Sequence, residues 1–133
     1  GPRSIAYLDF AGSAAETIAH IRHNGRVTII WCSIGPRPRI LRVYGRGRQL
    51  LKGASGFTEL SDLVAEYNGT RSIITVEATR IADSCVFGVP EMELIGPRER
   101  MLEWADNQTP DELESYMRKN NTTSIDGLPA WRG

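Results

Sequence analysis

The feature that most constrains the fold is a long β-type segment, Arg39 to Leu50, that contains two internal glycines. Its side chains alternate between two faces, one with Leu41 and Val43, the other with Ile40, Arg42, Tyr44, Arg46 and Arg48. Gly45 and Gly47 interrupt the pattern, and glycines inside strands are typical of bulges and barrel corners. We therefore expect a bent strand in a strongly curved sheet.

Further strand patterns lie on both sides of this segment. Ser4 to Phe10 predicts a strand with Ile5, Tyr7 and Asp9 on one face and Ala6, Leu8 and Phe10 on the other. A nearly continuous apolar run predicts a buried strand at 27–32, and further strands are expected at 71–86 and 92–95. Hairpin-linked strands with interleaved helices predict an α+β fold, a small antiparallel barrel with helices outside it.

Helix signals occupy the gaps between these strands. Ser13 and Glu16 have the spacing of a capping box, and Asn24-Gly25 ends the helix that follows. Apolar residues at helical spacing predict a helix at 57–67. Two closing helices are expected within about 97–120, the second beginning at a Thr109–Glu112 capping box with proline at its first position.

Charge and composition narrow the function classes. The chain has 16 basic and 16 acidic residues, so its formal net charge of zero gives no drive toward nucleic acid or an anionic membrane. No apolar stretch is long enough to span a bilayer, and no secretory leader is visible. Cys32 and Cys85 lie in apolar runs without partners at metal spacing, which predicts buried, reduced thiols in a cytoplasmic protein.

Two groups of residues could bind an anionic ligand. The Gly12-Ser13 turn precedes a helix, and a helix start offers free N–H groups to a phosphate; alternatively, Ser13 and Glu16 only cap the helix. The arginines of 39–48 could contact a phosphate, form a solvated strand face or pair ions at a subunit interface. His20 and His23 lack a third ligand nearby in the sequence, so no metal site is expected.

Several stretches, in order, resemble the FMN-binding split-barrel family related to pyridoxamine 5′-phosphate oxidase. They are Ile5-Ala6-Tyr7-Leu8-Asp9-Phe10-Ala11-Gly12-Ser13, Asn24-Gly25-Arg26-Val27-Thr28-Ile29-Ile30-Trp31-Cys32 and Pro38-Arg39-Ile40-Leu41-Arg42-Val43-Tyr44-Gly45-Arg46-Gly47. Asp83-Ser84-Cys85, Gly88-Val89-Pro90 and the tail Ser124-Ile125-Asp126-Gly127-Leu128-Pro129 resemble one uncharacterised subfamily of it. The matches cover most of the chain, which we expect to form one domain over 1–133.

The resemblance implies a split β-barrel, a homodimer and FMN bound between the subunits. It places cofactor contacts at Leu8, Asp9, Ser13, Ala14, Ala15 and Thr17, with Arg39 and Arg42 near the flavin ring or substrate. It also implies that the family's opening strands precede Gly1, and that Ala14-Ala15 replace an Arg-Lys pair of the family's well-known members.

The function expected from this resemblance is FMN-dependent oxidoreduction of a small molecule. No nucleophile–base pair stands out, which is consistent with a protein whose cofactor carries the chemistry. Two alternatives remain open at this point: a non-catalytic module that binds flavin, deazaflavin or haem, and a truncated paralogue that only dimerises.

Overall fold

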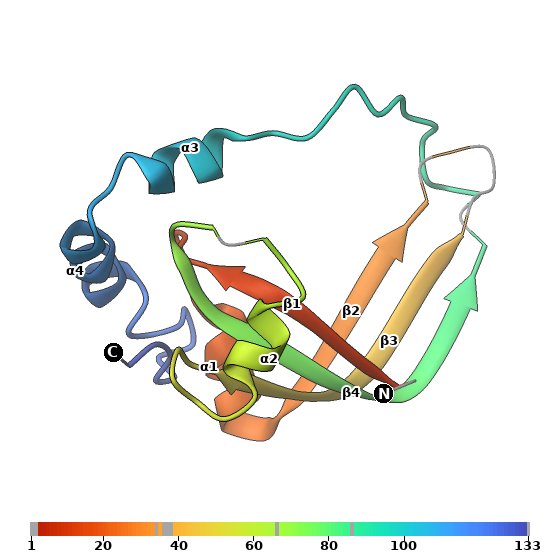
Figure 1. The fold of residues 1–133 in the computed structure, drawn as a ribbon. Coiled ribbons are helices and arrows are strands. Elements are labelled where there is room, and N and C mark those ends of the chain that lie inside the picture. The colour runs from red at the N-terminus through yellow and green to blue at the C-terminus, as the bar shows by residue number, and fades with distance from the viewer. Residues whose placement is uncertain (1–2, 34, 36–38, 66, 86, 133) are drawn as a thin grey trace.

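The protein folds around a four-stranded antiparallel sheet in the order β1-β4-β3-β2. The computed structural model describes residues 3–33, 35, 39–65, 67–85 and 87–132. The strands are β1 (Ser4–Phe10), β2 (Arg26–Cys32), β3 (Ile40–Leu50) and β4 (Thr70–Ser84). Figure 1 shows that the sheet curls into half a barrel, because the long β4 bends sharply along its length. The expected α+β class with a curved antiparallel sheet is confirmed.

The bend coincides with the glycine-containing part of β3. The register between β3 and β4 shifts between Tyr44 and Gly45, so that Thr79 is an extra residue on β4. The Thr79 hydroxyl donates a hydrogen bond to the Tyr44 carbonyl at 3.1 Å. A bulge of this kind increases local twist and turns the strand. The bulge predicted from Gly45 and Gly47 is confirmed.

Helix α1 (Glu16–Asn24) packs on one face of the sheet and forms the main core. Ile18 and Ala19 lie against Ile74 and Val76 of β4, all four essentially inaccessible to solvent. Gly47 allows this close approach, since a Cβ there would lie 2.6 Å from Cδ1 of Ile21. The helix ends at Gly25 with φ 71°, as the Asn24-Gly25 pair predicted.

Helix α1 begins differently from the prediction. Its N-cap is Ala15, with no side-chain cap, and Ser13 lies exposed in a bend outside the helix. The Glu16 carboxylate does not accept a hydrogen bond from Ser13. Its Oε1 instead accepts one from the Ile125 backbone N–H at 2.9 Å. The predicted Ser13–Glu16 capping box is therefore wrong: a contact with the distant C-terminal tail replaces the local one.

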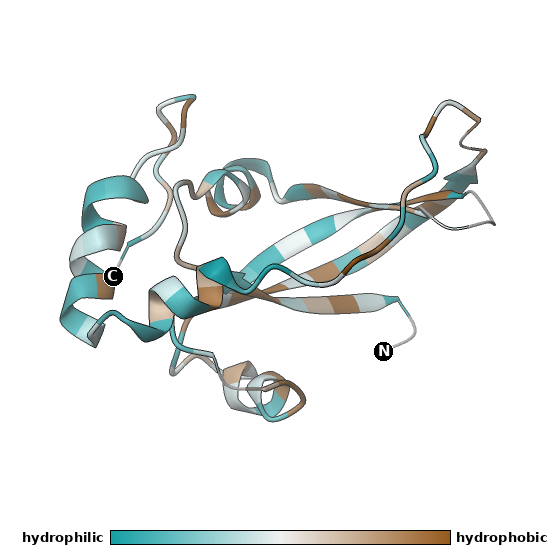
Figure 2. Ribbon diagram, turned by 90° about the horizontal axis from the view of Figure 1, so that it is seen from above, coloured by the Kyte–Doolittle hydropathy of each residue, from teal (hydrophilic) through white to brown (hydrophobic). Residues whose placement is uncertain are grey.

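The remaining helices cover the other side and one end of the sheet. Helix α2 (Phe57–Ser61) is shorter than the predicted 57–67, and Figure 2 shows helices on both sides of the sheet. Helices α3 (Arg100–Asp106) and α4 (Pro110–Asn120) follow a long segment that arches over the molecule in Figure 1. Among the residues that the structure describes, no helix is long and apolar enough to cross a membrane.

The start of α4 is the capping box that the sequence predicted. The Thr109 hydroxyl accepts from the Glu112 N–H at 3.3 Å, and the Glu112 carboxylate accepts from the Thr109 N–H at 2.8 Å. The hydrogen bonds from the Thr109 backbone and side chain lower the pKa of Glu112. The contact therefore stabilises the helix start fully at pH values above the pKa that Glu112 has in the unfolded chain. This stabilisation is lost as the pH falls through the lower pKa that Glu112 has in the folded protein.

Three other expectations are wrong, all because these parts of the chain lack a covering layer. β2 is an edge strand whose second half is open to solvent, with Ile30 55% exposed, rather than a buried strand. Cys32 and Cys85 are exposed, not buried. Residues 92–95 form no strand and are exposed.

The bulge gives a direct test of the fold. A Gly45→Ala methyl group would overlap the backbone carbonyl oxygen of Glu77, which cannot rotate away. We expect Gly45→Ala to lower the free energy of unfolding by about 3 kcal/mol, the upper part of the range for overpacking. Gly88→Ala is the control, since nothing lies within 4 Å of a Cβ there. Urea denaturation measures both, and equal effects of the two substitutions would contradict the packing described.

Candidate functional site

A buried ion pair holds the turn between β1 and α1. Both oxygens of the Asp9 carboxylate accept from the Arg71 guanidinium, at 2.9 and 2.8 Å, and the Ser72 hydroxyl donates to Asp9 at 2.6 Å. The Arg71 and Asp9 side chains are only 4% and 11% exposed. Arg71 reaches Asp9 because the β1–β4 register shifts there: Asp9 faces Ser72 and Phe10 faces Thr70, so Arg71 is the extra residue of a bulge.

The Arg71 guanidinium also holds the backbone of the turn between β1 and α1 in place. Arg71 donates to the Ala14 carbonyl at 3.3 Å and to the side-chain carbonyl of Asn121 at 2.7 Å. Asn121, fully buried at the end of α4, donates in turn to the Gly12 carbonyl at 2.8 Å. Two carbonyls of the turn therefore point inward, toward the buried network.

The inward carbonyls determine where the N–H groups of the turn point. In a trans peptide the C=O and the following N–H point in opposite directions, and no cis peptide occurs in the described residues. The N–H groups of Ser13 and Ala15 therefore point away from the network. Ser13, Ala14 and Thr17 are exposed, whereas Ala15 as a whole residue, its backbone included, is only 2% exposed. Of the two N–H groups, only that of Ser13 is therefore on an exposed residue, where an anion beside the helix start could reach it.

The network engages the Asp9 side chain, and the charge of Asp9 contributes to the pKa of nearby Tyr7. The Asp9 carboxylate is occupied by Arg71 and Ser72, so it acts as a structural anchor of the turn. Burial, and secondly the negative charge of Asp9, raise the pKa of the Tyr7 hydroxyl. Tyr7 therefore keeps its proton to a higher pH than a solvated tyrosine.

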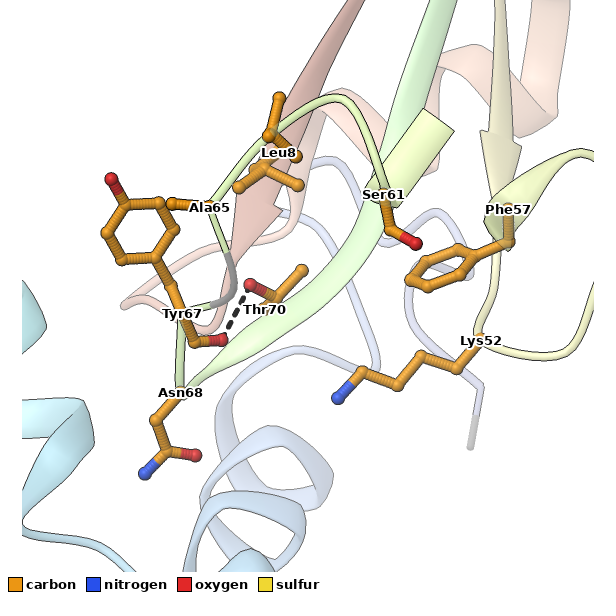
Figure 3. A pocket seen from close by; sticks show the side chains of 9 residues that line it. Leu8, Lys52, Phe57, Ser61, Ala65, Tyr67, Asn68 and Thr70 are labelled. Carbon is orange, nitrogen blue, oxygen red and sulfur yellow. Dashed lines mark hydrogen bonds between the residues drawn. The ribbon is translucent and has the colours of Figure 1, made fainter. Parts of the chain in front are cut away.

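Leu8 faces the other side of the sheet and lines a cavity of about 420 Å³. Figure 3 shows Leu8 of β1 with Phe57 and Ser61 of α2, and the Lys52 side chain at the edge of the cavity. Thr70 donates to the Tyr67 carbonyl at 2.8 Å and closes one wall. A cavity lined about equally by polar and apolar side chains, with one ammonium group at its edge, can hold a small molecule that carries an acidic group.

Arg39 and Arg42 lie at the opposite end of the sheet from the turn. Arg39 is 71% exposed and pairs with Asp83 at 3.6 Å, while Arg42 donates to the Ser84 hydroxyl at 3.0 Å. Ser84 ends β4 and Thr70 begins it beside the turn, so nearly the whole strand separates the two groups. One chain therefore does not bring Arg39 and Arg42 together with Ser13 and Thr17.

The arginine face of β3 has contacts of its own near the bulge. Arg46 donates to the Asn24 carbonyl at 2.8 Å, and Arg80 lies over the Tyr44 ring at 5.7 Å. Arg26 and Arg46 line an open groove of about 620 Å³ together with His20. These contacts are compatible with the interpretation of a partly solvated strand face.

Sequence reasoning missed Arg71, Asn121 and Asp126. Asp9 shares a strand face with apolar side chains, and a charged residue in such a place needs a buried partner of opposite charge. This requirement was the sequence signal that could have pointed to Arg71. Asn121 and Asp126 follow α4 and reach the turn and α1 only because the tail folds back over them. No local pattern reports such long-range contacts.

Comparisons with known proteins bear on the whole chain. The chain is 33% identical to the pyridoxamine 5′-phosphate oxidase family protein ustO of Aspergillus flavus, over 96% of its own length and 57% of that protein. It thus spans a little over half of this relative. No family model matches the chain, and no solved structure matches it.

The buried ion pair can be tested by removing one partner. Asp9→Ala leaves the Arg71 guanidinium buried without a counter-charge, which costs about 3–5 kcal/mol of unfolding free energy. Asp83→Ala removes the partner of an exposed arginine and is expected to cost less than about 1 kcal/mol. Urea denaturation of the two variants provides the comparison. A loss for Asp9→Ala no larger than that for Asp83→Ala would show that the network does not hold the turn.

Proposed function

Because the chain belongs to the pyridoxamine 5′-phosphate oxidase family, we propose that it binds FMN and acts as an FMN-dependent oxidoreductase on a small molecule. The observation that supports the proposal is the turn before α1, where Ser13 and Ala14 are exposed and the Ser13 N–H points away from the Arg71–Asn121 network. The turn begins α1, so the helix dipole adds to the attraction for a phosphate.

The residues of the turn suit a phosphate in shape and in donors. Gly12, Ser13 and Ala14 are small, and a Cβ built on Gly12 meets only the Phe10 carbonyl, at 3.9 Å. The Ser13 and Thr17 hydroxyls add two donors to the backbone N–H groups. Ala14 and Ala15 offer no charge, so affinity rests on the backbone of a turn that is held rigid by buried hydrogen bonds.

The chemistry would come from the cofactor. FMN held at this site would supply hydride-transfer chemistry, and the protein would position it and exclude competing reactions. In this proposal Ser13, Thr17 and the turn hold the phosphate, and Arg39 and Arg42 supply positive charge near the ring or the substrate. Leu8 lines the cavity beside Lys52, and the Lys52 ammonium group would accommodate an acidic group of a small substrate.

A homodimer completes this site, because the turn and the two arginines lie at opposite ends of one sheet. Large apolar side chains are exposed around the arginine end: Ile30, Trp31 and Ile81 on the strands, and Phe87, Leu94 and Ile95 on the arching segment. An apolar surface of this kind marks an interface with another chain. A second copy would cover it and bring its own turn to Arg39 and Arg42.

A substitution at Ser13 tests whether the FMN phosphate binds at the turn, and it should leave the fold intact. Ser13→Ala removes a hydroxyl donor to a charged group, so the Kd for FMN should rise about tenfold, as measured by quenching of flavin fluorescence. Unfolding free energy should change by less than about 0.5 kcal/mol, because Ser13 does not cap α1. Ser55→Ala, in an exposed turn, serves as the control and should bind FMN as the unmodified chain does. An unchanged Kd in Ser13→Ala would exclude Ser13 from the site.

The shared site can be tested by mixing two defective variants. Ser13→Asp repels the phosphate, and the double variant Arg39→Gln, Arg42→Gln lacks the charges of the other half of the site. After random exchange of subunits, half of the dimers are mixed and each has one intact site, so about one quarter of FMN sites should return. FMN absorbance retained after gel filtration measures the recovery. No recovery in the mixture would show that the cofactor does not bridge two chains.

A further inference from the structure

Three potential metal ligands meet where the C-terminal tail crosses helix α1. Glu16 and His20 are one turn apart on α1, and Asp126 comes from a turn in the tail. The His20 Nε2 atom lies 3.7 Å from Oε2 of Glu16 and 3.3 Å from Oδ2 of Asp126. All three ligand atoms lie within 4.8 Å of one another.

These separations match the demands of a small divalent cation. Zinc–nitrogen and zinc–oxygen bonds of about 2.1 Å at tetrahedral angles place ligand atoms about 3.4 Å apart. Two of the separations, 3.3 and 3.7 Å, bracket that value. One imidazole with two carboxylates is a ligand set suited to Zn²⁺, whereas Mg²⁺ and Ca²⁺ prefer oxygen ligands alone.

The surrounding contacts orient two of the ligands. Oε1 of Glu16 accepts from the Ile125 N–H at 2.9 Å, which leaves Oε2 directed at His20. The turn that carries Asp126 is closed by the Gly127 N–H donating to the Ser124 carbonyl at 3.0 Å, and Ser124 itself is buried. Hydrogen bonds that fix the ligands in this way strengthen metal sites.

We propose that Glu16, His20 and Asp126 form a zinc-binding site that fastens the C-terminal tail to α1. The three side chains are 37%, 41% and 61% exposed, so water fills the fourth position of the metal. The competing interpretation is that the three side chains contact one another at these distances without binding a metal.

The experiment compares the two histidines of α1 in the full chain after treatment with EDTA. Competition with a chromophoric zinc chelator at pH 7.5 should show one saturable Zn²⁺ per chain. His20→Ala should weaken binding more than about 100-fold, and Asp126→Asn about 10-fold or more. His23→Ala is the matched control, because His23 lies on the same helix outside the cluster, and it should bind as the unmodified chain does.

Three results would overturn the proposal. They are the absence of saturable Zn²⁺ binding, equal binding by His20→Ala and His23→Ala, and binding of Mg²⁺ as tight as that of Zn²⁺, which would indicate only a diffuse acidic surface. Thermal unfolding gives a second measurement. Zn²⁺ in excess should raise the Tm of the unmodified chain and of His23→Ala but not that of His20→Ala, since only a ligand of the folded state stabilises it.

Discussion

The paired charges of Arg71 and Asp9 are the contact on which the rest of the structure depends. The guanidinium joins four parts of the chain: β1 through Asp9, β4 from which it extends, the turn at Ala14, and the end of α4 through Asn121. A buried charge is costly unless it is paired and hydrogen-bonded, and no buried side-chain nitrogen or oxygen in the described residues lacks a partner. The network therefore specifies one arrangement of these four segments rather than merely adding stability.

That arrangement has consequences for ligand binding. With the Gly12 and Ala14 carbonyls held inward, the N–H of the exposed Ser13 points away from the buried network, which is the feature that the proposed phosphate site uses. Nearly the whole length of β4, which bends at the Thr79 bulge, separates this turn from Arg39 and Arg42. A site that uses both groups must be built from two chains, and the apolar side chains exposed beside the arginines are in keeping with such an assembly.

Local signals predicted local structure well and distant contacts poorly. The alternation and glycines of β3, the left-handed end of α1 at Gly25 and the Thr109 capping box are confirmed, because each depends on neighbouring residues. The Ser13–Glu16 capping box was equally plausible as a pattern and is wrong, because Glu16 accepts a backbone N–H more than a hundred residues away. The buried strand at 27–32 failed for a related reason: an apolar run does not report whether another layer covers it.

Sequence patterns alone predict the four strands and four helices in their order along the chain, the place of the bend and the related family, although they also predict a strand at 92–95 that does not form. The contacts of each carboxylate became visible only in the folded chain, where Asp9 is paired with Arg71 and Asp126 lies beside His20. Periodicity and capping act over a few residues, whereas the distance between two charged groups far apart in the sequence is set by the whole fold.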